Sequence, residues 1–463
     1  MKNTSPSEYD VVIVGGGASG TALLYTLARY TDIPHIALLE KYDALGTVNS
    51  APSNNSQTLH VGDIETNYSI EKARDVRTAS LMVKRYTDTL PYVEREVIIR
   101  TIQKTLLAVG ESEVRTMTER YEQLRNIFST LEKLDAAGIM SVEPEVMRGR
   151  DPHESVLAFF EKNGYAVDFG ALSKSLAKNA QNTRSGIDVY TSCEVTRVAR
   201  SSDGYLLHTR HGWTITARAV IFDTDAYSLG FAKSLGYGKE FSLIPIAGSF
   251  YFTPKLLRGK VYTVQEPRMP FAAVHGDPDL TRDDVTRWGP TARFYPVLEA
   301  GKIGTMLAFL KASGGLRWQT YASFISILLE PIRFVYLARN FFYDLPIIGV
   351  YFFAPQVRKI VPSIRVHDIK RAKGYGGMRL QRVDTNTREL LLGEGKIIGD
   401  NIIFNMTPSP GASVCLYNAM HDAKTIAGFF DGQYDFRKTD MLTDICTEPV
   451  TNDDISLRES YPS

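Results

Sequence analysis

The stretch YDVVIVGGGASGTALLYTLARY (residues 9–30) constrains the fold of this chain more than any other segment. A run of β-branched residues predicts a buried strand, a glycine turn follows, and apolar residues at helical spacing predict a helix. Gly15, Gly17 and Gly20 occupy the three positions of a GxGxxG motif. These glycines permit a tight turn, a close backbone approach to a pyrophosphate, and close contact between helix and strand. The segment therefore predicts a dinucleotide-binding βαβ unit.

A second predicted strand, in HIALLEKY, ends near Glu40, which lies 20 residues after Gly20. That spacing is expected of the acid that hydrogen-bonds a ribose hydroxyl. Ala18 and Ser19 begin the predicted helix and would turn their backbone N–H groups toward the phosphates. The alternative, an ordinary glycine turn followed by a surface glutamate, leaves the agreement of strand, turn, helix and acid unexplained. The motif does not distinguish NAD from FAD, because both contain the ADP half.

Length and composition place the chain among ordinary globular proteins. The 463 residues exceed a single compact core and predict two or three domains. With a net charge of +1, the composition gives no indication of a nucleic-acid partner. No signal peptide and no uninterrupted apolar run of about 18 residues is present, so we expect neither export nor a spanning helix. The cysteines form no CxxC pair and indicate neither a disulfide framework nor a metal site: Cys193, Cys415 and Cys446.

The polar run NNSQTLHVGDIETNY (residues 54–68) stands where a second βαβ unit would normally begin. An enzyme that uses FAD must carry the flavin ring away from the ADP site and seat it beside a substrate. A loop that lays backbone and amide groups along the cofactor would serve that purpose. Ser56, Gln57 and Thr58 are therefore expected cofactor contacts.

Four blocks of the chain resemble known flavoproteins. The first is similar to the segment after the second strand in the D-amino-acid oxidase branch of the glutathione-reductase-like fold, and the others resemble malate:quinone oxidoreductases. The resemblance runs from about residue 8 to 430 and departs from the usual pattern at Asp225, where the wider branch has glycine, and at Val414. The blocks are NSQTLHVGDIETNYSIEKA (55–73), VHGDPDLTRDDVTRWGPTARFYP (274–296), AKGYGGMRLQ (372–381) and GDNIIFNMTPSPGASVCLYNAM (399–420).

This resemblance implies FAD as cofactor and the oxidation of L-malate to oxaloacetate, with electrons passed to a membrane quinone. In the resembled fold, Val195 contacts the adenine through its backbone. The loop MTPSPGAS, shaped by proline and glycine, leads into a helix and would aim backbone N–H groups at the flavin edge that becomes negative on reduction. The cofactor contacts expected in this loop are Pro410, Gly411, Ala412 and Ser413.

The expected fold is α/β, or α+β overall, with a Rossmann-like FAD-binding domain and a substrate domain built on a mostly antiparallel β-sheet with helices. The FAD-binding domain would be assembled from residues 1–75, 165–235 and 365–435. The substrate domain, also expected to face a membrane, would span 236–364. Residues 76–164 are predicted to form a helical segment that packs on the FAD-binding domain, and 436–463 a loosely ordered polar tail.

Oxidation of a 2-hydroxy acid by a flavin moves a hydride from C2 to flavin N5 while a base takes the hydroxyl proton. His60 and His275 lie in the matching blocks and are the two candidate bases; alternatively, each serves only to orient a loop. Arg379 is the expected carboxylate clamp, because a guanidinium binds a carboxylate bidentately, and its alternative is a surface arginine on a strand. Arg293 or Lys373 could bind a second carboxylate.

The composition of residues 311–373 bears on the acceptor that reoxidises the reduced flavin. They contain ten basic and three acidic residues, a net charge of +7, interleaved with aromatic and aliphatic runs. Cationic side chains beside amphipathic segments suit a helix lying in an anionic membrane surface. The alternative is a buried hairpin with a solvated basic rim. The quinone-reducing family favours peripheral attachment at the cytoplasmic face of the cell membrane.

Three rival functions remain open on the sequence. The same flavin chemistry could act on L-lactate or L-2-hydroxyglutarate, since the base and clamp would be shared and pocket size decides. A soluble NAD dehydrogenase would leave the His60 segment and the loop before Ser413 without a role. A non-catalytic flavin-fold binding protein would keep the N-terminal glycines but have no use for Arg379.

Overall fold

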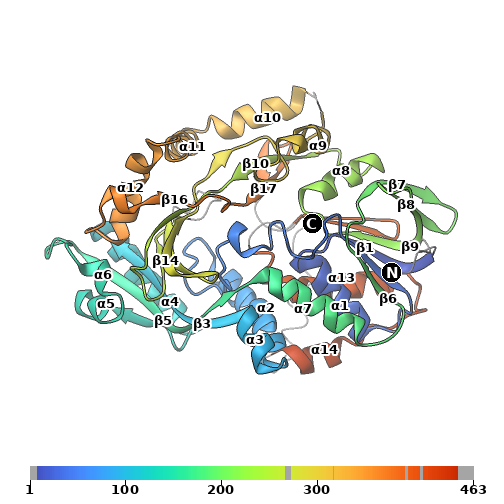
Figure 1. Ribbon diagram of the computed structural model, residues 1–463, viewed down its shortest axis with the longest axis horizontal. Helices are drawn as coiled ribbons and strands as arrows, with labels where there is room; N and C mark the ends of the chain where they lie inside the picture. Colours follow the sequence, from blue (N-terminus) through green and yellow to red (C-terminus); the bar gives the residue numbers. More distant parts are fainter. Residues whose placement is uncertain (1–7, 266–272, 316–317, 392–394, 407–409, 447–463) are drawn as a thin grey trace.

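Two large sheets lie side by side in the computed structural model, which describes residues 8–265, 273–315, 318–391, 395–406 and 410–446. One sheet, at the right of Figure 1, contains the N-terminal strand, and the other, at the left, contains β3, β5 and β14. The helices α10, α11 and α12 run along the upper left edge of the molecule in the same view. The mixed α/β fold class predicted from the sequence is confirmed.

The first sheet has eight strands in the order β19-β20-β9-β1-β2-β6, with β7 and β8 added beside β9. Strand β1 pairs in parallel with both β2 and β9. The alternate residues of β1 face two different cores, so Val11 and Ile13 pack with one cluster and Val12 with another. The strands are β1 (Glu8–Val14), β2 (Ile36–Leu39), β6 (Ile187–Tyr190), β7 (Val195–Ser201), β8 (Gly204–Thr209), β9 (Thr214–Phe222), β19 (Gly395–Gly399) and β20 (Ile402–Met406).

Helices cover both faces of this sheet. On one side, α1 packs against α7 and α13, and on the other α8 packs against β20. Because both faces are covered, the strands are nearly continuous apolar runs, as expected for parallel strands. The four helices are α1 (Ala18–Tyr30), α7 (Phe169–Gln181), α8 (Ala226–Ser234) and α13 (Cys415–Gly428).

Two further sheets are mostly antiparallel. The larger has eight strands in the order β16-β11-β14-β13-β12-β3-β5-β4, and the smaller has four in the order β15-β10-β17-β18. Only the pair β12 and β3 is parallel among the described strands of these two sheets. The strands are β3 (Ile99–Val109), β4 (Glu132–Leu134), β5 (Val156–Val167), β10 (Phe241–Ala247), β11 (Tyr251–Pro254), β12 (Lys260–Thr263), β13 (His275–Asp279), β14 (Arg282–Gly289), β15 (Arg293–Phe294), β16 (Lys370–Arg371), β17 (Met378–Asp384) and β18 (Glu389–Leu391).

The helical prediction for residues 76–164 is wrong in part, because β3 and β5 are long strands. They pair with each other along most of their length. Lys104 of β3 is fully buried and its Nζ donates to Asp63 Oδ1 at 2.7 Å. This buried ion pair accounts for a charged residue in a strand of the core. The helices of this region are α2 (Ile70–Asp88), α3 (Tyr92–Ile98), α4 (Glu111–Leu124), α5 (Ala136–Val142) and α6 (Pro144–Met147).

The prediction of a loose tail after residue 435 is also wrong in part. Residues Lys438–Ile445 form helix α14, which packs against α1 and α2. Met441 and Ile445 are buried in the core formed by α1 and its neighbours. Met441 and Ile445 are four residues apart, and most residues around them are polar. Two such positions are too few to predict a helix from the sequence. Residues 447–463 of the predicted tail lie outside the described residues.

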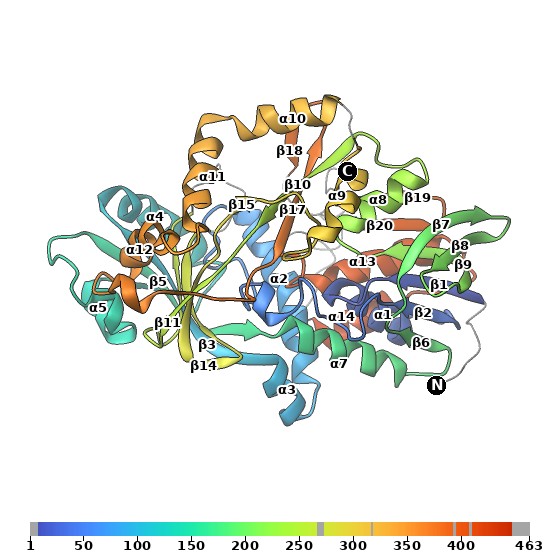
Figure 2. The same cartoon turned by 45° about the horizontal axis from the view of Figure 1, so that its top comes forward.

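Residues 311–373 are largely helical in their described part. Figure 2 shows α10 and α11 meeting at a sharp bend above the smaller sheet. Short 3-10 turns also occur at Pro52–Asn54, Ile303–Thr305 and Val366–Asp368. The helices of the region are α9 (Met306–Ala312), α10 (Trp318–Leu328), α11 (Pro331–Tyr343) and α12 (Gly349–Ile360).

The first sheet depends on a stack of aromatic rings that joins distant parts of the chain. Phe404 on β20 is fully buried and stacks on Phe222 of β9, with ring centroids 5.3 Å apart. We expect Phe404→Ala to lower the free energy of unfolding by about 3–5 kcal/mol, because it leaves a cavity between the two strands. Urea denaturation measures this loss. The exposed Tyr92 is the control: Tyr92→Ala should change stability by no more than about 0.5 kcal/mol, and equal losses in both variants would contradict the prediction.

Candidate active site

A cleft opens at the carboxyl ends of β1, β2 and β9, the edge at which open parallel sheets bind ligands. The residues that line it come from the glycine turn, the segment after β2, the start of β7, the segment after β9, and the region around Glu299. Seven residues predicted from the sequence to contact the cofactor lie in its wall: Gly15, Gly17, Ala18, Ser19, Glu40, Val195 and Ala412.

The glycine turn leaves no room for side chains. Gly15 has a φ of +114°, and a Cβ atom there would lie 2.3 Å from the carbonyl oxygen of Asp223. A Cβ atom on Gly20 would lie 2.0 Å from the carbonyl oxygen of Gly15. Helix α1 therefore begins directly against the turn, and its first N–H groups face the cleft. Such a cradle fits a pyrophosphate.

Glu40 is held in the position expected of a ribose-binding acid. One carboxylate oxygen accepts a hydrogen bond from Gly16 N at 2.7 Å, and the other accepts one from Tyr42 N at 2.9 Å. Burial raises the pKa of Glu40, although these two bonds act in the opposite direction. The side chain is buried yet lines the cleft, so its remaining lone pairs can accept from ribose hydroxyls.

His60 lies outside this cleft, in a loop that also contacts the C-terminal part of the chain. Its Nδ1 lies 2.5 Å from Glu65 Oε1, and its Nε2 lies 3.2 Å from Ser56 Oγ. The backbone N–H of His60 donates to Ser413 Oγ at 3.1 Å, and Ser413 Oγ donates to the Thr58 carbonyl at 3.3 Å. The loop that ends in Pro410, Gly411 and Ala412 is thereby fastened beside His60; residues 407–409 of that loop lie outside the described residues.

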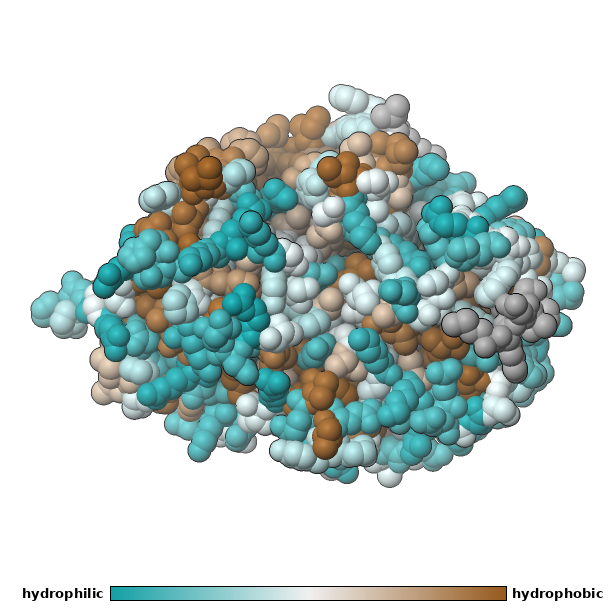
Figure 3. Space-filling view, in the orientation of Figure 1, coloured by the Kyte–Doolittle hydropathy of each residue, from teal (hydrophilic) through white to brown (hydrophobic). Residues whose placement is uncertain are grey.

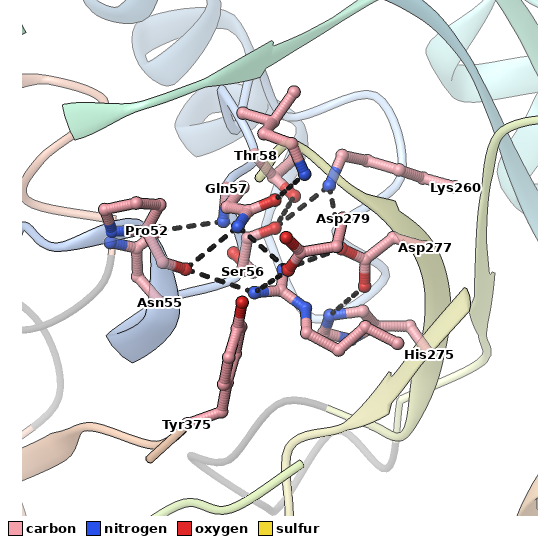
Figure 4. Close-up of polar contacts among 12 residues, drawn as sticks. Pro52, Asn55, Ser56, Gln57, Thr58, Lys260, His275, Asp277, Asp279 and Tyr375 are labelled. Carbon is pink, nitrogen blue, oxygen red and sulfur yellow. Dashed lines mark hydrogen bonds and ion pairs between the residues drawn. The ribbon is translucent and has the colours of Figure 1, made fainter. Parts of the chain in front are cut away.

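Gln57 explains why the segment before His60 is rich in amides. The Gln57 side chain is fully buried, and its Nε2 donates to the Pro52 carbonyl and to Asp279 Oδ2, at 3.0 and 3.2 Å. Its Oε1 accepts from Leu280 N at 2.9 Å. Figure 4 shows this amide between the loop and strand β13. The Gln57 and Thr58 side chains thus bond to other parts of the protein, and their predicted contact with the cofactor stays a prediction.

A buried cluster of ionised groups lies directly beneath this loop (Figure 4). Arg287 Nη2 donates to Asp277 Oδ2 at 2.6 Å, and Lys260 Nζ lies 3.3 Å from the same oxygen. Lys260 also donates to the Ser56 carbonyl at 2.9 Å, and Arg287 lies 3.5 Å from Asp279. The pKa of Asp277 is lowered, because the cations outweigh the effect of burial, whereas burial lowers the pKa of Lys260 to about 8.

His275 is part of the wall of this cluster. Its side chain is 1% exposed, and burial lowers its pKa to about 3, so the imidazole is neutral. Nδ1 donates to the Ala273 carbonyl at 3.2 Å, and the ring stacks on Tyr262 with centroids 4.4 Å apart. The Tyr262 hydroxyl in turn lies 2.5 Å from Thr58 Oγ1. The arrangement shows His275 in a core position behind the loop that bears His60.

Arg379 lies on β17 opposite Ile246 of β10. Its charge interacts with Tyr336 of α11 and with Tyr262, and burial lowers its pKa. Within the described part of the chain it forms no hydrogen bond or ion pair. A partly buried guanidinium without an anion is suited to bind an anionic ligand. Arg293, in contrast, lies 3.5 Å from Asp344, and Lys373 is exposed.

Several residues of the site were not found from the sequence. Glu65 and Tyr262 belong to no recognised motif. Asp277 and Asp279 of the buried cluster lie in a block that resembles the family, but they were not singled out.

Asp225 has a φ of +51°, which explains why the wider branch has glycine there: the backbone is in the left-handed region. Its ψ of −121° places it outside the αL region, the left-handed conformation that aspartate adopts more readily than most residues, so glycine suits this position better.

The buried cluster should make a large contribution to stability. We expect Asp277→Asn to lower the free energy of unfolding by roughly 3–5 kcal/mol, because it leaves Arg287 and Lys260 buried without their main anion. Chemical denaturation measures the loss. Asp284→Asn is the matched control, since Asp284 lies on the neighbouring strand in an exposed pair with Arg282 and should change stability by about 0.5 kcal/mol at most. A loss of the same size in the control would show that the cluster has no special role.

Comparison with known proteins agrees with this geometry. The family model described as malate:quinone oxidoreductase (Mqo) matches residues 7–294. A malate:quinone oxidoreductase from Helicobacter pylori (strain ATCC 700392 / 26695) is 38% identical over 453 residues, covering 96% of this chain and 99% of that protein. A mitochondrial L-2-hydroxyglutarate dehydrogenase from Nematostella vectensis is 27% identical over 441 residues, covering 89% of each chain.

The fold is similar to that of solved flavoproteins. The structure of L-alpha-glycerophosphate oxidase from Mycoplasma pneumoniae with FAD bound superposes with a TM-score of 0.61 at 18% sequence identity, covering 91% of this chain and 95% of that chain. The glycine cradle and the placement of Glu40 fit the ADP half of FAD, the predicted cofactor. The chain belongs to the malate:quinone oxidoreductase family and is an FAD-dependent oxidoreductase.

Proposed function

We propose that this enzyme oxidises L-malate to oxaloacetate and delivers the electrons to a quinone in a membrane. The observation that carries the proposal is Arg379, a partly buried guanidinium that has no anionic partner among the described residues. Membership of the malate:quinone oxidoreductase family supports malate as the acid. When bound, FAD supplies the acceptor, taking a hydride from C2 of the substrate at its N5 position.

Arg379 would hold the substrate carboxylate next to C2 by two parallel hydrogen bonds. Tyr262 and Tyr336 lie near Arg379 and would shape the same site. The guanidinium stays charged at every pH of interest, so it fixes the orientation of the acid without taking part in proton transfer. This orientation decides which face of C2 is turned toward the cofactor.

His60 is the base in this proposal. Because Glu65 holds Nδ1, that nitrogen keeps its proton and Nε2 is the acceptor. The malate hydroxyl would replace Ser56 Oγ as the hydrogen-bond partner of Nε2. Burial acts to raise the pKa of Glu65, but the hydrogen bond to His60 and its charge lower it, so the carboxylate is ionised and can stabilise an imidazolium. His275 is placed behind the loop, where its neutral ring supports Tyr262.

The substrate test uses anaerobic reduction of the purified holoenzyme. We expect L-malate to bleach the flavin absorbance and a short-chain quinone to restore it. L-2-Hydroxyglutarate and L-lactate are the comparison acids, since they share the carboxylate and hydroxyl that the base and clamp would bind. The relative from Nematostella vectensis makes L-2-hydroxyglutarate the stronger rival. Bleaching by that acid and not by malate would reassign the substrate, and no bleaching by any acid would favour a binding protein.

The clamp has a separate test. We expect Arg379→Lys to lower kcat/KM for the oxidised acid by about tenfold or more, a loss of about 1.4 kcal/mol, because an ammonium cannot bind a carboxylate bidentately. Flavin content should stay unchanged. Arg382→Lys on the same strand is the control, since Arg382 lies over the ring of Phe241 instead. Unchanged kinetics in Arg379→Lys would remove this residue from the site.

The helices α10, α11 and α12 support the membrane part of the proposal. Large apolar side chains are exposed along them, and Figure 3 shows brown patches over this edge of the molecule. In the described part of the chain no single helix is long and apolar enough to cross a bilayer; Thr320–Leu328 and Pro331–Tyr343 reach that length only together, with a bend of 84° between them. We call the following exposed residues the apolar edge: Trp318, Ile325, Leu329, Phe334, Val335, Phe341, Phe342, Ile347, Ile348, Tyr351 and Phe352.

This apolar edge has the chemistry of a surface that lies in the membrane interface. It is too extended for a typical exposed patch of a water-soluble monomer, and exposed cations such as Arg339 and Arg358 accompany it. Tyr336, on the same helix as Phe334 and Val335, lies near Arg379. A quinone that enters from the bilayer along α11 would therefore approach the site of substrate oxidation.

Membrane contact is measured by co-sedimentation with vesicles that contain phosphatidylglycerol. We expect Phe334→Glu combined with Val335→Glu to lower the bound fraction at least tenfold, because two charges are introduced where apolar side chains would enter the interface. Val93→Glu combined with Val97→Glu on α3 is the control, since these valines are similarly exposed but lie outside the apolar edge. Equal binding of both variants would show that the membrane contacts another surface.

A further inference from the structure

Asp225 stands at the edge of the dinucleotide cleft in an unusual backbone conformation. It follows β9, immediately precedes α8, and has a φ of +51°. Its Oδ2 accepts a hydrogen bond from Asn49 Nδ2 at 2.8 Å, and both residues line the cleft. Two residues earlier, the carbonyl of Asp223 lies against Gly15 of the pyrophosphate cradle. The carboxyl group of Asp225 is therefore part of the wall that receives the cofactor.

The cleft offers this carboxyl group no counter-charge. Lys41 is the one cation among the described residues that line it, and Lys41 is bound to Glu299. Glu299 also accepts hydrogen bonds from Tyr42 and Tyr227, at 2.5 and 2.7 Å. The other acids in the wall are Glu40, Glu194, which pairs with Arg210, and Asp223.

The elements packed against α8 provide no cation either. These elements are α9, β20, β10 and β7. Strands β10 and β20 contain no charged residue. The basic residues of the remaining elements, and of α8 itself, form no ion pair with Asp225: Lys233, Lys311, Arg197 and Arg200. The bond from Asn49 and a backbone contact at Ala226 are thus the polar contacts that the described residues make with the carboxyl group of Asp225.

We propose that Asp225 binds FAD as a neutral carboxylic acid, so that the cofactor enters the cleft together with a proton. An ionised carboxylate in this wall would face the doubly charged pyrophosphate with no cation between them, whereas the neutral acid carries an O–H group that can donate to it. A glycine, as in the wider branch, would avoid the repulsion but supply no donor. The proposal concerns the cofactor alone and holds whichever acid the enzyme oxidises.

The protein alone already shifts Asp225 toward the neutral acid. Burial raises the pKa of Asp225 to about 7. A bound dianion raises it further, because like charge disfavours ionisation. Below pH 7 Asp225 is protonated with and without cofactor and contributes no pH dependence. Above pH 7 the free protein loses this proton and must regain it on binding, so the affinity for FAD falls as pH rises, by up to tenfold per pH unit.

The test measures release of FAD from the full-length holoenzyme on dilution at several pH values between 6 and 9, using the fluorescence of free flavin. We expect the Kd of the wild type to rise at least tenfold between pH 7 and 9. Asp225→Asn keeps the size and shape of the side chain but cannot ionise, so its Kd should change less than threefold over that range. Asp225→Gly, which suits the conformation, should be equally flat.

A second acid in the cleft, Glu194, tests whether the pH dependence comes from Asp225 or from any carboxylate there. Glu194→Gln removes a carboxylate that already pairs with Arg210, and it should keep the pH dependence of the wild type. The proposal is overturned if the wild type shows no pH dependence, or if Asp225→Asn and the wild type show the same slope. Failure of L-malate to reduce the flavin would leave these affinities unchanged, so the two proposals fail separately.

Discussion

The contact of Asp277 with Arg287 and Lys260 is the interaction on which the site depends. These groups are withdrawn from water, so each cation is stable there only because the carboxylates are present. Through Lys260 and Gln57, the same cluster holds the backbone of residues 52–58 against the sheet that contains β13 and β14. His60 comes two residues after this segment. The buried ion pairs of the cluster therefore fix its position.

The two halves of the proposed chemistry are held by different physical means. The cofactor cleft is shaped by the absence of side chains, since Gly15 and Gly20 allow backbone to touch backbone. The substrate side is shaped by side chains whose partners are fixed, with Glu65 on His60 and Thr58 on Tyr262. Arg379 is the exception, because its partner would be the ligand itself. A site built this way is rigid where it binds FAD and keeps one strong interaction for the substrate.

The sequence predicted the cofactor cleft well because its determinants are local. A strand, a glycine turn, a helix and an acid at fixed spacing can be recognised within about thirty residues, and Glu40 lies in the predicted cleft. The sequence failed at β3 and β5, which pair with each other as long strands inside a region predicted to be helical, because that pairing joins residues far apart in the chain. It also could not choose between His60 and His275. That choice depends on burial, which is set by residues from distant strands.

The order of strands in the first sheet bears on how such a protein is made. Its central strand, β1, is synthesised first, yet its neighbour β9 comes some two hundred residues later, and β20 lies beyond the whole second sheet. A nascent chain on the ribosome therefore carries an apolar strand with an open edge until most of the polypeptide has emerged, the situation in which chaperones protect a chain from aggregation. The cofactor cleft, which Ala412 helps to line, is complete only after this C-terminal part of the fold has been synthesised.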